Sequence, residues 1–202
     1  PAKPNIILGH EYCGEIVEVG PAVDWLNPGD KVVVDPHPPC GSCRNCRSDR
    51  PNLCTTLYSQ QGTPYAEHGV TRGLFADGAL TSYTCVPANS VYKVAKDTPY
   101  QLAALAEPLS CVGYAIEKLN IQAGDSVCIL GAGPMGLLFA SMARANGATK
   151  VIVSEPHEYR RSKALKCGAT RVVNPKTENL KELCLAETEG LGVMHCIEAV
   201  GQ

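Results

Sequence analysis

The sequence predicts a protein in two parts, a β-rich domain followed by an α/β domain built on a parallel sheet. Residues 1–98 contain short β-type runs separated by turns with Gly and Pro. From Asp125 onward, strand and helix patterns alternate, which implies a parallel sheet with right-handed crossovers. A stretch with apolar positions at helical spacing, residues 99–119, joins the two parts. We therefore assign residues 1–98 and 120–202 to two domains and residues 99–119 to a connecting helix.

The first domain is expected to contain strands and one irregular lobe. Glu15–Val19 and Lys31–Val34 are apolar β-type runs, and Asn27-Pro28-Gly29-Asp30 is a turn signal between them. Residues 36–57 interrupt this pattern with Pro, Cys, Arg and Asn, so we expect an irregular lobe there. Thr98 is a candidate cap for the connecting helix.

The second domain is expected to alternate four strands with three helices. The helix that begins at Pro134 is predicted to stop at Asn146-Gly147. The expected strands are Ser126–Leu130, Lys150–Ser154, Arg171–Asn174 and Val193–Val200, and the expected helices are Pro134–Asn146, His157–Cys167 and Glu178–Thr188.

Composition argues against several classes of function. The net charge is −2 and aromatic residues make up 5% of the chain, so neither a basic field nor a set of stacking rings indicates nucleic-acid binding. No apolar run is long enough to cross a bilayer, and residues 1–4 show no signal-peptide pattern. Eleven cysteines in a chain with ordinary strands and helices favour reduced thiols, and therefore a cytoplasmic protein, over a secreted disulfide scaffold.

Four cysteines lie close together in the lobe, at Cys40, Cys43, Cys46 and Cys54. Zinc prefers tetrahedral sulfur ligands, and four thiolates close its coordination shell, so we predict a structural zinc site. Two disulfides, free thiols or an iron–sulfur site are the alternatives. A nucleic-acid-binding zinc ribbon is a further alternative, because Arg44, Arg47 and Arg50 make the lobe locally basic, but no aromatic residues accompany them.

A second motif, Gly131-Ala132-Gly133-Pro134-Met135-Gly136, has the G-x-G-x-x-G spacing. It follows an expected strand and opens an expected helix, which is the context of a dinucleotide-binding turn. Gly131 allows the tight turn, Gly133 lets the backbone approach a pyrophosphate, and Gly136 lets helix and strand pack closely. Glu155, at the end of the next strand, would accept hydrogen bonds from the adenosine ribose and repel a 2′-phosphate, which favours NAD. Arg160, Arg161 and Lys163 weaken that preference, because cations can accommodate a phosphate.

A third group of residues has the chemistry of an open metal site. His10 and Glu11 are adjacent zinc-ligand types. Glu107 stands in an apolar helix, where a carboxylate needs a metal or a polar pocket to offset its burial. Cys111, one turn further on, is an alternative ligand or a packed thiol. The remaining histidines have no matching partners in the sequence and are expected to be structural or exposed; they are His37, His68, His157 and His195.

These motifs occur in one order that resembles the zinc-containing medium-chain alcohol and polyol dehydrogenase family. The resemblance covers essentially the whole chain and rests on Gly9-His10-Glu11, the four-cysteine lobe, Glu107-Pro108-Leu109 and the Gly131–Gly136 turn, together with Gly29-Asp30-Lys31-Val32. It implies a partial GroES-like catalytic domain followed by a partial Rossmann domain with a doubly wound parallel sheet. It also implies NAD and zinc as cofactors, a small alcohol or polyol as substrate, and a homo-oligomer.

The resemblance also assigns roles to individual residues. It implies that His10, Glu11 and Glu107 form the catalytic zinc centre and that Glu107 before Pro-Leu is typical of the sorbitol dehydrogenase branch. The resemblance implies that in that branch the glutamate binds the zinc-bound water or the substrate instead of the metal itself. Pro134, Met135, Glu155 and Arg160 correspond to cofactor contacts. The implied reaction is hydride transfer from a secondary alcohol to NAD.

The sequence departs from the family at both ends. The family's first catalytic zinc ligand is a cysteine in a Cys-Gly-Ser/Thr-Asp motif, and no cysteine precedes His10 here. The last Rossmann strands have no counterpart either, so we expect a truncated chain without a complete active site. Threonine and formaldehyde-type dehydrogenases share this scaffold and remain alternatives, as does a zinc- and nucleotide-binding module without catalysis. We expect one tightly held zinc, with the His10 site weak or empty.

Overall fold

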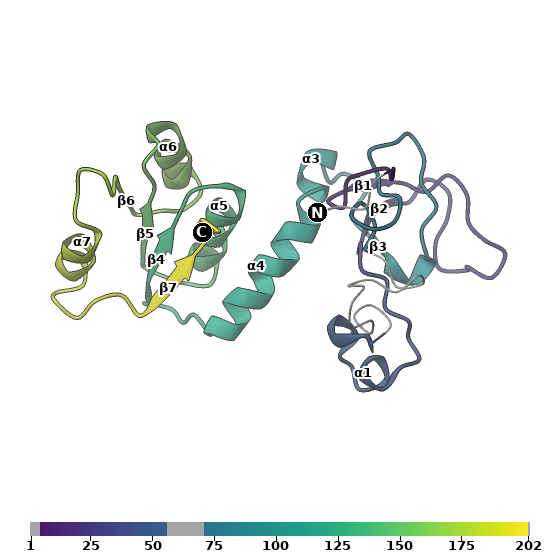
Figure 1. Cartoon of the computed structure of the whole chain (residues 1–202), viewed down its shortest axis with the longest axis horizontal. Coiled ribbons are helices and arrows are strands. Elements are labelled where there is room, and N and C mark those ends of the chain that lie inside the picture. The colour runs from purple at the N-terminus through teal and green to yellow at the C-terminus, as the bar shows by residue number, and fades with distance from the viewer. Residues whose placement is uncertain (1–4, 56–70, 202) are drawn as a thin grey trace. The chain divides into compact units, whose positions relative to one another are not determined.

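The computed structural model describes residues 5–55 and 71–201, which form two compact units, Pro1–Glu107 and Pro108–Gln202. Figure 1 traces both units along the chain. The fold class expected from the sequence is confirmed, because the first unit contains an antiparallel sheet and the second a parallel sheet with helices. In the part of the chain that the structure describes, no helix has both the length and the apolar character needed to span a membrane.

The first unit is built on three short antiparallel strands in the order β1-β2-β3. These are β1 (Cys13–Glu15), β2 (Lys31–Val34) and β3 (Val91–Lys93). Val32 and Val34 on β2 and Val91 on β3 are buried with Leu26 in a small core. The other described elements are short: α1 (Arg44–Arg47), η1 (Pro51–Leu53), η2 (Ala88–Ser90) and α3 (Tyr100–Ala103).

The first strand lies earlier in the chain than the expected run Glu15–Val19. Glu15 pairs with Lys31, the first residue of β2. The Ile16 N–H then bonds the Asp30 carbonyl at 2.9 Å, and the Ile16 carbonyl accepts the Gly29 N–H at 2.8 Å. Residues beyond Ile16 therefore pass the end of the partner strand, where the turn over residues 27–30 offers them no ladder to extend.

The second unit is a four-stranded parallel sheet in the order β6-β5-β4-β7. Its strands are β4 (Ser126–Leu130), β5 (Lys150–Ser154), β6 (Arg171–Val173) and β7 (His195–Glu198), and its helices are α5 (Pro134–Ala145), α6 (Glu158–Lys166) and α7 (Leu180–Glu187). Successive residues of β4 face opposite sides of the sheet. Val127 and Ile129 pack with α5 and α6 residues, whereas Cys128 packs with Cys184 of α7. Helices therefore cover both faces of the sheet.

The segment expected as one helix over residues 99–119 contains two helices, α3 and α4 (Ala106–Leu119). Pro108 explains the interruption. In a continuous helix, its ring would clash with the carbonyl of the residue four positions earlier, Ala104. Starting a new helix at Ala106 places Pro108 in the first turn, where the missing N–H costs nothing. Val112 and Ile116 then bury α4 against the core of the second unit.

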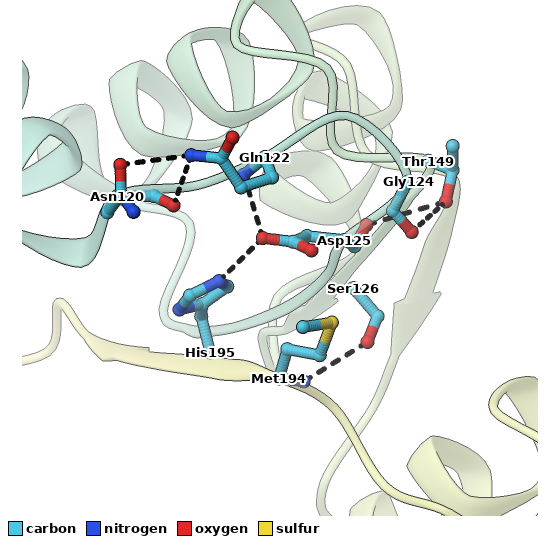
Figure 2. A network of polar contacts seen from close by, with 8 residues as sticks. All are labelled: Asn120, Gln122, Gly124, Asp125, Ser126, Thr149, Met194 and His195. Carbon is cyan, nitrogen blue, oxygen red and sulfur yellow. Dashed lines mark hydrogen bonds and ion pairs between the residues drawn. The ribbon is translucent and has the colours of Figure 1, made fainter.

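A polar network joins the amino-terminal ends of three strands of the second unit (Figure 2). Asp125, just before β4, accepts a hydrogen bond from the Gln122 N–H at 2.8 Å and pairs with His195 Nε2 of β7 at 2.9 Å. Its backbone carbonyl accepts the Thr149 N–H at 2.9 Å, next to β5. The expectation that His195 is structural or exposed agrees with this contact, in which its ring lies against a buried carboxylate 70 positions away; the sequence did not indicate that partner.

Candidate metal and dinucleotide sites

The four cysteine sulfurs of the lobe converge to within 4.8 Å of one another. Cys43 Sγ lies 3.5 Å from Cys46 Sγ, and Cys40 Sγ lies 3.9 Å from Cys46 Sγ. Zn–S bonds of about 2.3 Å in a tetrahedron separate the sulfurs by roughly 3.8 Å, so these separations fit one zinc ion. None of these four cysteines forms a disulfide, so the disulfide alternative does not describe this structure.

The lobe is described as far as residue 55, and its short elements aim backbone N–H groups at the sulfurs. The Cys43 N–H donates to Cys40 Sγ at 3.3 Å, and the Cys40 N–H donates to Cys54 Sγ at 3.4 Å. The backbone N–H of Cys46, followed by that of Thr55, lowers the pKa of the Cys43 thiol to about 7. Partial burial, with the neighbouring Cys43 sulfur, raises the pKa of Cys46 to about 12. The thiolate of Cys43 therefore forms more readily than that of its neighbour Cys46.

The second candidate metal group consists of His10, Glu11 and Glu107, whose ligand atoms also lie within 4.8 Å of one another. His10 Nε2 is 4.0 Å from Glu11 Oε1, and their side chains are 33% and 51% exposed. Glu107 reaches the group from the first turn of α4. All three residues belong to the first unit. One nitrogen and two carboxylates, partly open to solvent, suit a metal site that keeps a position for another ligand.

The pKa of Glu107 in this group is also affected by two side chains that the sequence did not indicate, His37 and Asp35. Burial raises the pKa of Glu107, while His10 and His37 lower it and Glu11 and Asp35 oppose them. His37 is held near Asp35, whose Oδ1 lies 3.6 Å from His37 Nδ1 and accepts the His37 N–H at 2.8 Å. His37 is therefore structural, as one of the two expected outcomes, but the sequence did not indicate its partner Asp35. The proximity of His37 to Glu107 depends on a contact across 70 positions, for which the sequence carries no signal.

The glycine turn after β4 has close backbone contacts at two of its three glycines. A Cβ on Gly136 would lie 2.1 Å from the Gly131 carbonyl oxygen, so only glycine lets α5 approach the strand end this closely. Gly131 itself has φ +96°, in the left-handed region. Gly133 caps α5 and has open space where a Cβ would stand, and Pro134 occupies the first helical position. The open side of the turn therefore faces away from the packed interior, as a cofactor approach requires.

Glu155 is buried under this turn with both carboxylate oxygens engaged. Glu155 Oε2 accepts the Ala132 N–H at 3.0 Å, and Oε1 accepts the His157 N–H at 2.9 Å. Burial alone raises the pKa of Glu155, but the His157 and Ala132 N–H bonds outweigh it, with Arg160 adding to them, so the net shift is downward. The carboxylate is ionised at neutral pH. Each oxygen keeps a lone pair for a further donor.

Arg160 and Met135, the other residues that the resemblance assigns to cofactor contacts, lie beside Glu155 and against the core, respectively. Arg160 Nη1 is 3.9 Å from Glu155 Oε2, and the Arg160 side chain is 55% exposed. Arg161, by contrast, donates to the backbone carbonyls of Glu155 and Pro156 at 2.8 and 2.7 Å, so it braces the strand end. Met135 packs partly buried against the core beside the turn. His68 lies outside the described residues.

Two family descriptions match the chain. Residues 1–96 match the alcohol dehydrogenase GroES-like domain, and residues 134–202 match the zinc-binding dehydrogenase domain.

Curated relatives with this arrangement are named for one amino-acid dehydrogenase. The L-threonine 3-dehydrogenase of Thermococcus kodakarensis is 42% identical over 201 residues, which cover 98% of this chain and 53% of the relative. The L-threonine 3-dehydrogenase of Shewanella frigidimarina is 39% identical over 190 residues. The chain therefore spans about half the length of the curated relatives it matches.

Solved structures agree with this arrangement. A zinc-binding dehydrogenase from Sinorhizobium meliloti bound to NADP has a TM-score of 0.86 at 35% identity, covering 100% of this chain and 56% of that one. Galactitol-1-phosphate dehydrogenase from Escherichia coli has a TM-score of 0.80 at 28% identity, covering 97% and 53%. With its GroES-like antiparallel unit, its Rossmann-type parallel unit and these matches, the chain belongs to the zinc-binding medium-chain alcohol dehydrogenase family.

Proposed function

We propose that the protein is a zinc- and NAD-dependent dehydrogenase that oxidises a secondary alcohol to a ketone. The observation that carries the proposal is the convergence of His10, Glu11 and Glu107, in a chain that also holds a glycine turn with a buried acidic residue. Zinc, when bound, supplies Lewis-acid polarisation of the substrate hydroxyl, and nicotinamide accepts the hydride.

The chain's own residues hold and orient these groups. His10 offers a ring nitrogen and Glu107 a carboxylate to one metal ion, while Glu11 adds negative charge beside them. Cys40, Cys43, Cys46 and Cys54 would hold a second, structural zinc. Gly133 and the start of α5 would leave room for the pyrophosphate, and Glu155 would accept hydrogen bonds from the ribose hydroxyls. The negative charge of Glu155 favours NAD over NADP, with exposed Arg160, whose Nη1 lies 3.9 Å from Glu155 Oε2, as an opposing cation.

For the substrate, we propose a 2-amino-3-hydroxy acid of the L-threonine type. The curated relatives at up to 42% identity over almost the whole chain carry that name. A polyol is the second candidate, because Glu107-Pro108-Leu109 resembles the polyol branch and a polyol phosphate dehydrogenase is among the similar structures. Both candidates are secondary alcohols, so the same centre serves either.

The test is a substrate profile of the full-length protein with zinc bound, recorded as NADH formation. We expect L-threonine to give the highest kcat/KM and NAD to be preferred over NADP. A higher kcat/KM for sorbitol or galactitol 1-phosphate would favour the polyol candidate. A protein that binds zinc and NAD but oxidises neither class would refute the proposal and leave a binding module.

Metal content tests the two centres separately. We expect the 202-residue chain to retain one tightly held zinc, because four thiolates enclose it, and to lose metal readily from His10. Replacing Cys54 by Ser should abolish the retained zinc, whereas replacing Glu107 by Gln should not. Two zinc ions per chain that resist a chelator would contradict this expectation.

A further inference from the structure

The backbone immediately before His10 is bound by a loop distant in sequence. Gly78 donates its N–H to the Ile7 carbonyl at 2.7 Å, and Ala79 donates to the Gly9 carbonyl at 3.1 Å. Leu80 donates to the Leu8 carbonyl at 3.0 Å. In return, the Ile7 N–H reaches Asp77 Oδ1 at 2.9 Å. Residues 7–9 are therefore held by residues 77–80 through four hydrogen bonds.

Two glycines of the loop over residues 71–80, Gly73 and Gly78, approach Gly9 more closely than any other residue type allows. A Cβ on Gly73 would lie 2.2 Å from the Gly9 carbonyl oxygen and 2.4 Å from its carbon. A Cβ on Gly78 would lie 2.2 Å from the same oxygen and 2.5 Å from the Gly73 Cα. Real Cβ contacts below 3.0 Å essentially do not occur. The obstructing atoms are backbone, so no side chain can swing away.

The size of this conflict matters because His10 is the next residue. Relieving a 2.2 Å contact to 3.0 Å requires the Gly9 carbonyl or the loop to move by about 0.8 Å. Metal–ligand distances tolerate deviations of only about 0.2 Å. Moving Gly9 by such an amount carries the His10 ring away from the Glu107 carboxylate, with which it shares the candidate metal group.

We propose that Gly73 and Gly78 are positioning residues for His10. Because neither has a side chain, the loop over residues 71–80 packs directly on the Gly9 carbonyl and fixes where the His10 ring begins. The consequence for metal binding rests on the proposed function, whereas the consequence for the distance between His10 and Glu107 does not. Neither glycine touches the four-cysteine lobe among its nearest contacts, so the structural metal should be unaffected.

The chain offers matched controls for both glycines. Gly73 has φ +75°, and Gly29 has φ +86° with no atom within 4 Å of its would-be Cβ. Alanine at Gly29 therefore brings the same backbone strain without the collision. Gly78 does not have a positive φ, and Gly20 matches it in having open space around the would-be Cβ. All four glycines belong to the first unit.

The experiment uses NMR, without metal at that site, to measure how much the Glu107 carboxylate changes the chemical shifts of the His10 ring. The histidine rings are isotope-labelled, and His10 is assigned with a His10→Gln variant. The change in the His10 ring shifts caused by Glu107→Gln is then recorded in the starting protein and in the four glycine-to-alanine backgrounds. We expect a clear change in the starting protein, Gly29→Ala and Gly20→Ala, and loss of most of it in Gly73→Ala and Gly78→Ala. Zinc retained at the cysteine lobe reports that the first unit is still folded.

Asp77→Ala provides a variant that adds no collision, in case the alanine variants fail to fold. It removes the acceptor of the Ile7 N–H, and we expect it to reduce the His10 response partially. An undiminished response in folded Gly73→Ala and Gly78→Ala, or in Asp77→Ala when those do not fold, would overturn the proposal. Equal losses in the controls would overturn it too.

A separate zinc titration of the full-length protein distinguishes this inference from the proposed function. If the His10 site binds zinc, Gly73→Ala and Gly78→Ala should weaken it by about 10- to 100-fold, as loss of other ligand-orienting contacts does. The controls should leave it unchanged. Absence of any second zinc in the starting protein would count against the proposed function alone, since the NMR response does not depend on it.

Discussion

Glu155 shows how one carboxylate can be part of the fold and of a binding site. Its oxygens accept N–H groups from Ala132, in the glycine turn, and from His157, before α6. The carboxylate therefore fixes the turn that would hold the pyrophosphate while presenting charge to the ribose. A neutral side chain of the same shape would keep the first role in part and lose most of the second.

We predict that Glu155→Gln weakens NAD binding by roughly 10- to 100-fold, because hydrogen bonds to a charged group contribute about 1.5–3 kcal/mol. NADP should be affected less, since the repulsion of its 2′-phosphate disappears. Calorimetric titration with both cofactors measures the two affinities. Glu158→Gln, at an exposed position in the first turn of α6, is the matched control. Equal losses for NAD and NADP would show that Glu155 acts only on the turn.

At the scale of elements, the ends of β4 and β7 are joined by a contact between the Asp125 and His195 side chains as well as by the ladder. Asp125 and His195 have side chains that are only 8% and 15% exposed (Figure 2). The Gln122 N–H, followed by His195, lowers the pKa of Asp125 below its ordinary value. Because the pKa of Asp125 is lower in the folded state, its ionised carboxylate stabilises the fold at pH values above the unfolded pKa of about 3.9. This stabilisation is lost as the pH falls through the folded-state pKa.

We therefore predict that Asp125→Asn destabilises the second unit at neutral pH and that the difference from the starting protein shrinks below about pH 4. Denaturant unfolding at several pH values, followed by a signal from the second unit, measures this. Glu117→Gln, which removes an exposed carboxylate of α4, should leave the pH profile unchanged. A constant difference between Asp125→Asn and the starting protein down to acidic pH would contradict the prediction.

The elements also show what local patterns reveal. The bounds of β4 and β5 agree with the expected strands, because each is a short apolar run flanked by turn residues. The two motifs that depend on local spacing, the cysteine lobe and the glycine turn, were likewise predictable. What could not be predicted are contacts over long separations. His195 meets Asp125, Asp35 and His37 act on Glu107, and Gly73 reaches Gly9. Pro108 did carry a signal, since its ring conflicts with a continuous helix.

At the scale of the whole molecule, the two units contain different stabilising groups. The four-cysteine lobe and the His10 group lie in the first, and the glycine turn with Glu155 lies in the second. The described hydrophobic cluster of the first unit is small, with four buried residues, three of them on the strands β2 and β3, whereas a larger cluster covers the parallel sheet. The first unit is therefore expected to depend more on metal.

We predict that a strong chelator increases amide hydrogen exchange throughout the lobe and β2 but leaves β4 and β5 protected. Saturating NAD should instead decrease amide hydrogen exchange in β4 and β5 and leave exchange in the lobe and β2 unchanged. At 100 times its dissociation constant, it stabilises the state that binds it by about 2.7 kcal/mol. Exchange measured by mass spectrometry resolves the two units. Loss of protection in β4 on chelation would mean that the units do not respond separately.

The spacing of the lobe's sulfurs also bears on how the protein must be made and handled. Thiols at 3.5 and 3.9 Å from a common neighbour are near enough to couple oxidatively after small movements, and the Cys43 thiol ionises near neutral pH. A bound cation occupies all four sulfurs and withholds them from peroxide or air. Chains synthesised in zinc-poor cells should accumulate intralobe crosslinks that later zinc cannot reverse without a reductant. The supply of metal during synthesis then decides how much of the protein reaches its folded form.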